Sequence, residues 1–241
     1  MNKEFERQAL LLGDAAMKKL KSSYVALFGV GGVGSYAAEA LARSGIGRIL
    51  LVDCDTVSIS NINRQLCALH STVGKFKVDV VAERLLDINP ELKIETRRDF
   101  VLPENIDTFA FAEFDYVIDA IDTVSAKIAI AERCNALGTA LISSMGTGNK
   151  QDPTALKVTD ITKTNTCPLA RVIRRELKKR RIAHLAVVYS EEEAMTPLER
   201  ITTEGGKVVP GSLAFVPSVA GLIAAGEAVK HIIAKESAKN G

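Results

Sequence analysis

Residues 29–34 of the 241-residue chain read Gly-Val-Gly-Gly-Val-Gly, and this glycine-rich segment constrains the fold more than any other feature. It lies between an uninterrupted apolar run, 24–28, and a segment with helical periodicity, 35–43. An apolar run without alternation is typical of a strand covered on both faces. A strand, a glycine turn and a helix in this order predict a βαβ unit whose helix N-terminus offers free N–H groups to a phosphate.

The same alternation continues along the first two-thirds of the chain. We expect further strands at 48–52, 92–96, 116–120 and 140–143, with helices at 74–88 and 125–137. Strands that alternate with helices predict an α/β fold with a doubly wound, mostly parallel, Rossmann-like sheet.

The character of the sequence changes after about residue 146. We expect strands at 156–158 and 185–189, a basic helix at 168–181, an acidic loop at 191–206 and a closing helix at 218–233. No repeat or flexible linker separates the two parts. The sequence therefore predicts a nucleotide-binding region, 1–146, and a small C-terminal lobe, 147–241, within one compact domain.

Composition excludes several classes of protein. The chain has 31 Lys and Arg against 29 Asp and Glu, so a uniformly basic nucleic-acid coat is excluded, although a local basic patch is not. The start, 1–7, is polar and unlike a signal peptide, and the apolar stretch 213–229 is interrupted by Pro217 and Glu227. We therefore expect a soluble, cytoplasmic protein with no membrane partner.

The four cysteines are few and scattered. Cys54, Cys67, Cys134 and Cys167 form no Cys-x-x-Cys pair. Disulfide frameworks and four-thiolate zinc sites both need closely spaced or numerous cysteines. We therefore expect neither of them.

The glycine-rich segment and the acid that follows it predict a nucleotide site. Its glycines allow a tight turn and a close approach of backbone to phosphate; they are Gly29, Gly31, Gly32 and Gly34. Asp53 follows the next expected strand, where a carboxylate can accept hydrogen bonds from ribose hydroxyls. This pattern alone leaves NAD(P), FAD and ATP open, and a glycine turn without a ligand is the simpler alternative.

The residues that follow favour ATP. Asp55, Asn61, Arg64 and Lys77 lie close behind Asp53 in the sequence. A hydride-transferring enzyme has no need of such a cluster, whereas Arg and Lys offset the charge that develops on phosphates as pyrophosphate leaves. A solvated loop and helix face is the alternative for these two cations.

Asp122 comes two residues after an expected buried strand, at the edge of the sheet where ligands of open α/β folds collect. An isolated carboxylate there can cap a helix, whereas beside a triphosphate it suits Mg²⁺.

Five motifs in order resemble those of the ubiquitin-activating-like adenylyltransferases, a superfamily that includes bacterial activators of molybdopterin and thiamine sulfur-carrier proteins. The motifs are GVGGVGS at 29–35, VDCDTV at 52–57, SNINRQ at 60–65, TVGKFK at 72–77 and DAID at 119–122. The resemblance covers about residues 4–145.

The resemblance implies ATP and Mg²⁺ as cofactors and assigns roles to individual residues. Asp53 would bind the ribose, and Asp122 would hold Mg²⁺. Asn61, Arg64 and Lys77 would contact the phosphates and the adenylation transition state. The segment Phe-Glu-Arg-Gln at 5–8 is similar to an N-terminal segment whose arginine reaches the ATP of the other subunit, which implies a homodimer with Arg7 acting in trans.

The sequence departs from the sulfur-carrier activators at their usual structural zinc. Those enzymes use two Cys-x-x-Cys pairs, whereas the corresponding region here has a single cysteine, Cys167, so no zinc is expected. Cys167 could accept a thioester or receive sulfur from a relay protein. A lone cysteine is more often a small buried side chain.

The segment after Cys167 is strongly basic. Eight Lys and Arg and one Glu give residues 163–181 a net charge of +7. Helical spacing places four of the cations on one face: Arg171, Arg174, Arg175 and Lys178. Two more cations, Lys179 and Arg181, lie nearby in the sequence, and we expect all six to bind the same partner. Like charges at this spacing destabilise an isolated helix, so a polyanion such as RNA is a fitting partner. A solvated helix face is the alternative.

Residues 166–180 and 211–217 are similar to one branch of the superfamily, the tRNA threonylcarbamoyladenosine dehydratases. That likeness implies an ATP-dependent ring closure on a modified adenosine at position 37 of tRNA, through an acyl adenylate, with release of AMP and pyrophosphate. Two alternatives remain. One is an adenylyltransferase for the C-terminal glycine of a ubiquitin-like sulfur carrier, and the other is a non-catalytic nucleotide-sensing scaffold.

Overall fold

The computed structural model describes residues 3–202, 206 and 208–237 of the chain. Within these residues, seven strands form one sheet: β1 (Tyr24–Phe28), β2 (Arg48–Val52), β3 (Lys93–Arg97), β4 (Tyr116–Asp119), β5 (Leu141–Ser144), β6 (Leu156–Asp160) and β7 (Ala186–Ser190). The same part of the chain contains six α-helices: α1 (Glu6–Ser22), α2 (Gly34–Arg43), α3 (Lys77–Ile88), α4 (Val124–Leu137), α5 (Pro168–Lys179) and α6 (Phe215–Ser237).

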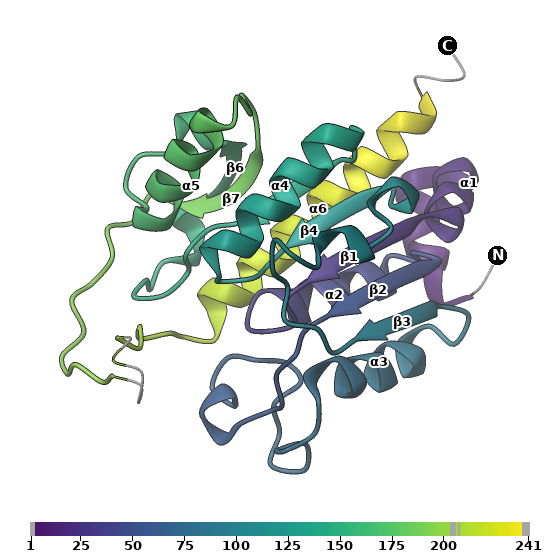
Figure 1. Ribbon diagram of the computed structural model, residues 1–241. Helices are drawn as coiled ribbons and strands as arrows, with labels where there is room; N and C mark the ends of the chain where they lie inside the picture. Colours follow the sequence, from purple (N-terminus) through teal and green to yellow (C-terminus); the bar gives the residue numbers. More distant parts are fainter. Residues whose placement is uncertain (1–2, 203–205, 207, 238–241) are drawn as a thin grey trace.

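The strand order is β3-β2-β1-β4-β5-β7-β6, and every pair is parallel except the antiparallel pair of β6 with β7 at one edge (Figure 1). This confirms the predicted α/β fold with a doubly wound, mostly parallel sheet. The order reverses between β1 and β4, and ligands of open α/β sheets bind at the carboxyl ends of the strands beside such a point. Strands β6 and β7 belong to the same sheet, so the C-terminal region extends the sheet of the first region.

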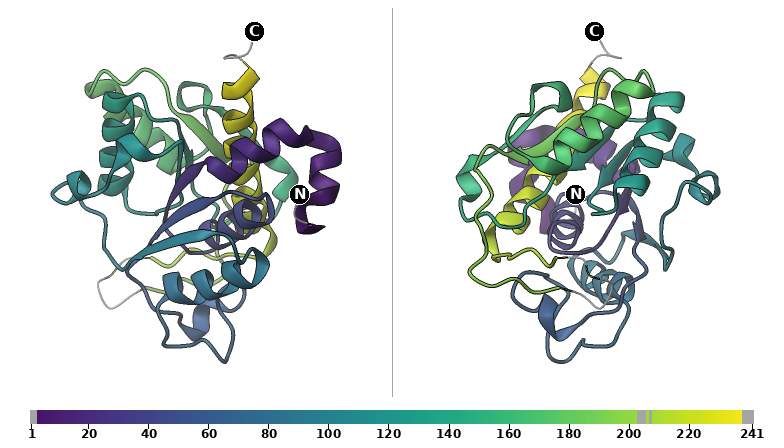
Figure 2. Two further views of the ribbon diagram at one scale, coloured as in Figure 1. Left: turned by 90° about the vertical axis from the view of Figure 1, so that its right-hand side faces the viewer. Right: turned by 60° about the vertical axis from the view of Figure 1, so that its left-hand side comes forward.

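Helices cover both faces of the sheet, as the two further views show (Figure 2). Alternate side chains of β1 divide between the faces: Val25 and Leu27 pack with α2, α3 and α6, whereas Ala26 and Phe28 pack with α4 and the turns before β4. Helix α5 packs beside α4 against β7. Burial on both faces explains why the central strands β1, β2 and β4 are apolar without alternation.

Helix α6 differs most from the expectation. It begins at Phe215 and ends at Ser237. The helix can start before Pro217 because this residue lies in the first turn, where its missing N–H interrupts no helical hydrogen bond. By length and composition, residues 215–234 could cross a membrane. Part of their apolar character follows from packing, because α6 lies against α2, and a Cβ on Gly221 would stand 2.1 Å from the carbonyl oxygen of Val33; 44% of this stretch is buried.

Two other helices are shorter than expected. Helix α3 begins at Lys77 rather than 74, because Gly74 has a φ of +87° and the chain pairs Phe76 with Thr56 before turning. Helix α5 ends at Lys179, and Arg181 adopts the left-handed region with a φ of +57°. The N–H groups of Arg181 and Ile182 then bond back to the carbonyls of Lys178 and Leu177, which is the Schellman arrangement.

Candidate nucleotide-binding site

A cavity of about 410 Å³ opens at the carboxyl ends of β1, β2 and β4. It gathers nearly all the predicted nucleotide residues: Gly29, Gly31, Gly32, Asp53, Asp55, Asn61, Arg64, Lys77 and Asp122 line it. These residues come from five separate segments of the chain, which the parallel sheet brings to one edge.

The glycines of residues 29–34 have different structural roles. Gly29 has a φ of +87°, and a Cβ there would stand 2.7 Å from the carbonyl oxygen of Ala120. Gly34 does not line the cavity: a Cβ there would stand 1.8 Å from the carbonyl oxygen of Gly29, so this glycine allows the helix to start against the turn. Gly31 faces the cavity, with only the Gln65 amide within 4 Å of its built Cβ. Backbone can therefore approach a ligand closely at Gly31.

Asp53 holds the glycine turn in place. One carboxylate oxygen accepts a hydrogen bond from the N–H of Val30 at 2.7 Å, and the other accepts from the N–H of Asp55 at 2.9 Å. Each carboxylate oxygen has two acceptor positions, so Asp53 can still accept from ribose hydroxyls.

Lys77 is the first residue of α3, and its side chain is only 6% exposed. Its ammonium donates to the carboxylate of Asp55 at 2.7 Å, whereas the Asp55 side chain is 62% exposed. The ion pair holds the ammonium at the cavity wall, with donor positions left for a second anionic group.

Arg64 and Asn61 are placed by the turn between β2 and α3. Arg64 donates through one guanidinium nitrogen to the carbonyl of Ser60 and to the side chain of Asn63, both at 2.9 Å. Asn61 accepts from the N–H of Ser58 at 3.0 Å. These local bonds fix the turn and leave the remaining guanidinium N–H groups of Arg64 for a ligand.

The acids of the cavity offer oxygen ligands, but its cysteine is a poor nucleophile. Asp122 lies exposed on the loop after β4 and lines the cavity. Ligand atoms of Asp53, Cys54 and Asp55 lie within 4.8 Å of one another. Partial burial and the adjacent Asp55 and Asp53 carboxylates raise the pKa of the Cys54 thiol, which disfavours a thiolate.

Sequence reasoning missed a buried ion pair beneath the Asp122 loop. The ammonium of Lys127, on α4, donates to Asp119 at 2.9 Å, to the hydroxyl of Ser143 at 3.0 Å and to the carbonyl of Ser144 at 2.8 Å. Asp119 also accepts from the N–H of Ile121 at 3.1 Å, so it shapes the loop that lines the cavity. A lysine inside the apolar run 126–131 was the one available signal.

Replacing Lys127 with Met should lower the free energy of unfolding by about 3–5 kcal/mol, because Asp119 would be left buried without its partner. Urea denaturation would measure this loss. The double variant with Asp119→Asn should recover part of it, since no buried charge then remains. Equal losses for the single and double variants would contradict this role of the ion pair.

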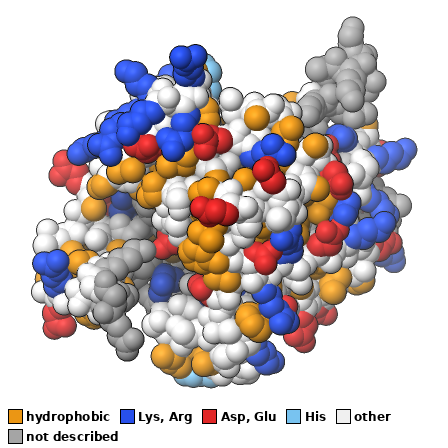
Figure 3. Space-filling view, viewed as in Figure 1, with side chains coloured by type: hydrophobic (Ala, Val, Ile, Leu, Met, Phe, Trp, Pro, Cys, Tyr) orange, Lys and Arg blue, Asp and Glu red, His pale blue; other side chains and the backbone are white. Residues whose placement is uncertain are grey.

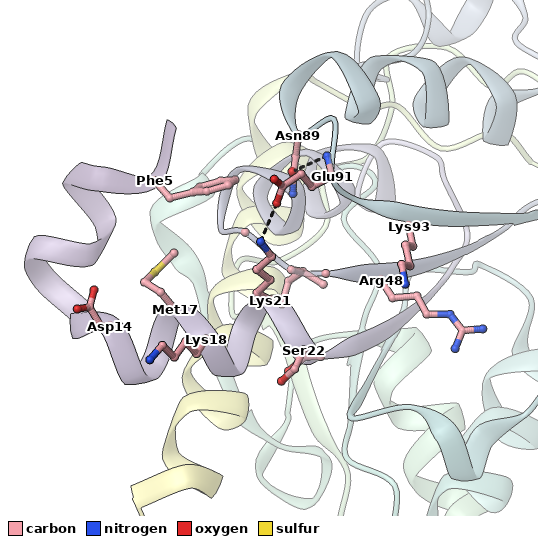
Figure 4. A pocket seen from close by; sticks show the side chains of 14 residues that line it. Phe5, Asp14, Met17, Lys18, Lys21, Ser22, Arg48, Asn89, Glu91 and Lys93 are labelled. Carbon is pink, nitrogen blue, oxygen red and sulfur yellow. Dashed lines mark hydrogen bonds and ion pairs between the residues drawn. The ribbon is translucent and has the colours of Figure 1, made fainter. Parts of the chain in front are cut away.

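A second cavity, of about 650 Å³, lies at the opposite edge of the sheet (Figure 4). Phe5 and Met17 of the N-terminal segment border it, and Lys21 forms an ion pair with Glu91 at 2.7 Å inside it. Helix α1 bends at Gly13, where φ is +77°. The amino ends of β2 and β3 lie here, so this cavity is separate from the edge where the glycine turn lies.

Two other sequence-predicted residues lie outside the nucleotide cavity. Arg7 is exposed on α1 and does not line the cavity of its own chain. Cys167 precedes α5 and is 2% exposed, packed in the cluster of Ile161 and Ile173. A buried thiol in that position has no access to a protein partner.

The basic residues of α5 border a groove of about 780 Å³. Its floor is apolar, and five cations line it: Arg171, Arg174, Arg175, Lys178 and Arg181. Lys and Arg side chains gather at the upper left of the molecule in Figure 3, over α5. The predicted sharing of one face is therefore confirmed. We call this feature the basic groove.

The cations of this segment are not equivalent. Arg174 donates to the carbonyl and hydroxyl of Thr164, at 2.7 and 2.6 Å, and Lys179 pairs with Glu176 outside the groove. Among the described residues, Arg171, Lys178 and Arg181 have no ion pair. Because no carboxylate among the described residues pairs with these three side chains, they are the best placed to bind a polyanion.

Known proteins resemble this chain over nearly its whole length. A model of the ThiF family matches residues 5–241. A tRNA threonylcarbamoyladenosine dehydratase from Bacillus subtilis strain 168 is 47% identical over 240 residues, covering 95% of this chain and 94% of that protein. Its counterpart from Escherichia coli strain K12 is 37% identical and covers 96% and 94%.

A solved structure of the Escherichia coli dehydratase in complex with ATP superimposes with a TM-score of 0.89 at 37% identity, covering 99% of this chain and 97% of that one. The fold and the near full-length similarity agree with one another. The chain therefore belongs to the ThiF family and, within it, to the tRNA threonylcarbamoyladenosine dehydratases.

Proposed function

We propose that this chain catalyses the ATP-dependent dehydration of N6-threonylcarbamoyladenosine in tRNA. The observation that most supports the proposal is the single cavity in which the glycine turn meets Arg64, Lys77 and Asp122. A triphosphate needs backbone N–H groups for its phosphates and cations for the charge that develops as pyrophosphate leaves.

In the first step, an oxygen of the substrate's threonyl carboxylate attacks the α-phosphorus of ATP. A P–O bond forms, the bond to the β-phosphate breaks, and the products are an acyl adenylate and pyrophosphate. A carboxylate alone is a poor electrophile, because attack would place more negative charge on an anion. Arg64 and Lys77 would stabilise the charge on the phosphates, and Asp53 and Asn61 would orient the nucleotide.

In the second step, a nucleophile in the same substituent, such as the ureido nitrogen, attacks the acyl carbon, which forms the N–C bond, expels AMP and releases the proton of that nitrogen. This closes a five-membered ring and completes the loss of one water. Intramolecular attack reaches effective molarities on the order of 10⁵ M when the groups are well oriented, so no protein thiol is required. The burial of Cys167 and the raised pKa of Cys54 agree with a route without a thioester.

The donor set of the cavity fits Mg²⁺, which prefers oxygen ligands and shares them with phosphates. Asp122 would hold the ion, and Asp55 lines the same cavity. When bound, Mg²⁺ supplies charge neutralisation for the triphosphate. The oxygen-only character of Asp122 suits this ion better than zinc.

The basic groove would bind the tRNA backbone. Its available cations are Arg171, Lys178 and Arg181, with Arg175 and Arg174 beside them and Lys179 on the adjoining surface. Phosphate contacts of this kind provide affinity that falls with salt.

We further infer a homodimer in the cytoplasm. Arg7 would reach the ATP cavity of the partner, an arrangement supported by its exposure and by the adjacent apolar surface of Leu10 and Leu11, which are 82% and 87% exposed. Residues 1–146 and 147–241 would act as one unit, because β6, β7 and α6 complete the sheet and its cover.

One assay tests the reaction. The protein is incubated with ATP and tRNA that contains threonylcarbamoyladenosine, and the digested nucleosides are weighed by mass spectrometry. Loss of the mass of one water from the modified adenosine, together with AMP release, supports the proposal. AMP or pyrophosphate release that depends on a ubiquitin-like carrier protein, with no change in the nucleoside, would instead identify a carrier activator.

A further inference from the structure

Between β7 and α6 the structure describes an outgoing arm, 191–202, and a returning arm, 208–212, which both meet the same short loop; we call these two arms the excursion. That loop, 148–152, follows β5 and lies next to Thr147, which lines the nucleotide cavity. The returning arm ends at Ser212, another lining residue, just before Pro217 of α6. The loop 148–152 therefore links the excursion to the cavity wall.

The outgoing arm is tied to this loop by several bonds. The ammonium of Lys150 is buried and donates to the carbonyls of Ser190 and Glu192, both at 3.0 Å. The backbone N–H groups of Gln151 and Asp152 donate to the carboxylate of Glu192, at 2.9 and 3.0 Å. Because these bonds involve several residues, the outgoing arm does not depend on one side chain.

Among the described residues, the returning arm is hydrogen-bonded to this loop through Asn149 alone. The N–H of Asn149 donates to the carbonyl of Gly211 at 2.7 Å, and the N–H of Gly211 donates to the Asn149 side-chain oxygen at 2.6 Å. Asn149 also accepts from Met195 on the outgoing arm through its carbonyl, at 2.7 Å. One residue thus bonds to both arms, and its side chain reaches only the returning one.

The backbone of Asn149 supports a specialised role. Its φ of +59° lies in the left-handed region, which Asn tolerates better than other residues that carry a Cβ. The adjacent Gly148 makes room for the returning arm, because a Cβ there would stand 2.9 Å from Pro210. Glycine would fit the conformation of residue 149 at least as well, so the shape of the turn does not by itself require the amide.

The returning arm forms part of the nucleotide cavity. The carbonyl of Ser212 accepts from the side chain of Asn63 at 2.9 Å, and Asn63 in turn accepts from Arg64. Pro217 lies 3.2 Å from the Cβ position built on Gly32. A shift of Gly211 would therefore be passed to Ser212, to the Asn63–Arg64 contact and to the wall beside the glycine turn.

We propose that Asn149 is a positioning residue for the nucleotide. Through Gly211 it fixes the Ser212 wall of the cavity and the orientation of Arg64. The inference rests on the proposed function only in taking ATP as the nucleotide. It adds a second determinant of ATP affinity, outside the glycine turn and the phosphate-binding cations.

The test is the dissociation constant for ATP, measured by titration calorimetry on the full chain. Asn149→Gly keeps the backbone conformation and removes the side-chain acceptor. We expect it to weaken ATP binding about tenfold, because one hydrogen bond is lost and the returning arm is held less firmly. Asn149→Asp keeps an acceptor oxygen and should remain within about twofold of the wild type. Asn165→Gly is the matched control, because Asn165 also accepts from a backbone N–H, that of Thr166 at 2.7 Å, away from the cavity.

Further readouts separate positioning from a folding defect. Melting temperatures should agree among the variants, and the KM for ATP of Asn149→Gly should rise while kcat at saturating ATP changes little. Unchanged ATP affinity in Asn149→Gly, or an equal loss in Asn165→Gly, would overturn the proposal. If the wild type binds ATP but dehydrates no tRNA, the affinity series still decides the role of Asn149 while the proposed function fails.

Discussion

Replacing Lys77 with alanine should lower kcat/KM for dehydration by about a thousandfold, the loss typical when a charge-stabilising donor is removed from a reaction centre. The Lys77 ammonium is held at the cavity wall by burial and by its 2.7 Å contact with Asp55. Its charge is therefore in place before ATP arrives, and water cannot replace it at the same position. Single-turnover formation of the dehydrated nucleoside would measure the effect.

The matched control for Lys77 is a neighbour of the same type. Lys75 is exposed and lies just before α3, so Lys75→Ala should keep kcat/KM within about twofold of the wild type. Affinity for tRNA should survive in both variants, because the basic groove is formed by α5. Comparable activity of Lys77→Ala and the wild type would rule out Lys77 as a group that stabilises the reacting phosphates.

Neutralising the basic groove should weaken tRNA binding about a hundredfold near physiological salt, and it should reduce the slope of log affinity against log salt by about 3. The variant replaces Arg171, Arg175, Lys178 and Arg181 with alanine. It spares Arg174, whose bonds to Thr164 help to hold α5, so the fold should be retained. Filter binding at several salt concentrations would measure both quantities.

A control variant has the same net charge as the groove variant, because it also loses four positive charges. It replaces four exposed lysines elsewhere: Lys18, Lys75, Lys93 and Lys230. If only long-range electrostatic attraction mattered, both variants would lose the same affinity for tRNA. An equal loss in the control would therefore show that the groove is not the docking surface. ATP affinity should stay unchanged in both, since neither removes a residue of the nucleotide cavity.

The nucleotide cavity could be predicted from the sequence because its signals are local. The glycine turn and Asp53 lie directly after strands, and the Arg64–Lys77 segment connects β2 to the start of α3, so a parallel sheet brings these positions together at one edge. The central strands β1, β2 and β4 could be predicted for a similar reason, since burial on both faces leaves an apolar run that an exposed strand would not have.

Other features depend on contacts between distant parts of the chain. The bond between Asn149 and Gly211 joins residues 62 positions apart, and neither residue stands out in the sequence. Lysine is a residue type usually found at the surface, and only the fold places the Lys127 side chain against Asp119 in the interior. Helix α3 begins three residues later than the sequence pattern predicts. Gly74 adopts a left-handed conformation, and Phe76 then forms a β-bridge with Thr56 before the helix starts.

The close packing of α6 against the start of α2 has a consequence for how the protein is made. The face of the sheet that includes Val25 and Leu27 is covered in part by α6, which follows every strand of the sheet in the sequence. During synthesis, the part of that face that α6 covers stays exposed until residues 215–237 have left the ribosome. A nascent chain that already contains every phosphate-binding residue therefore still exposes apolar surface to other chains and to chaperones. Until it is extended further, such a chain also lacks Ser212 and Pro217, which line the nucleotide cavity.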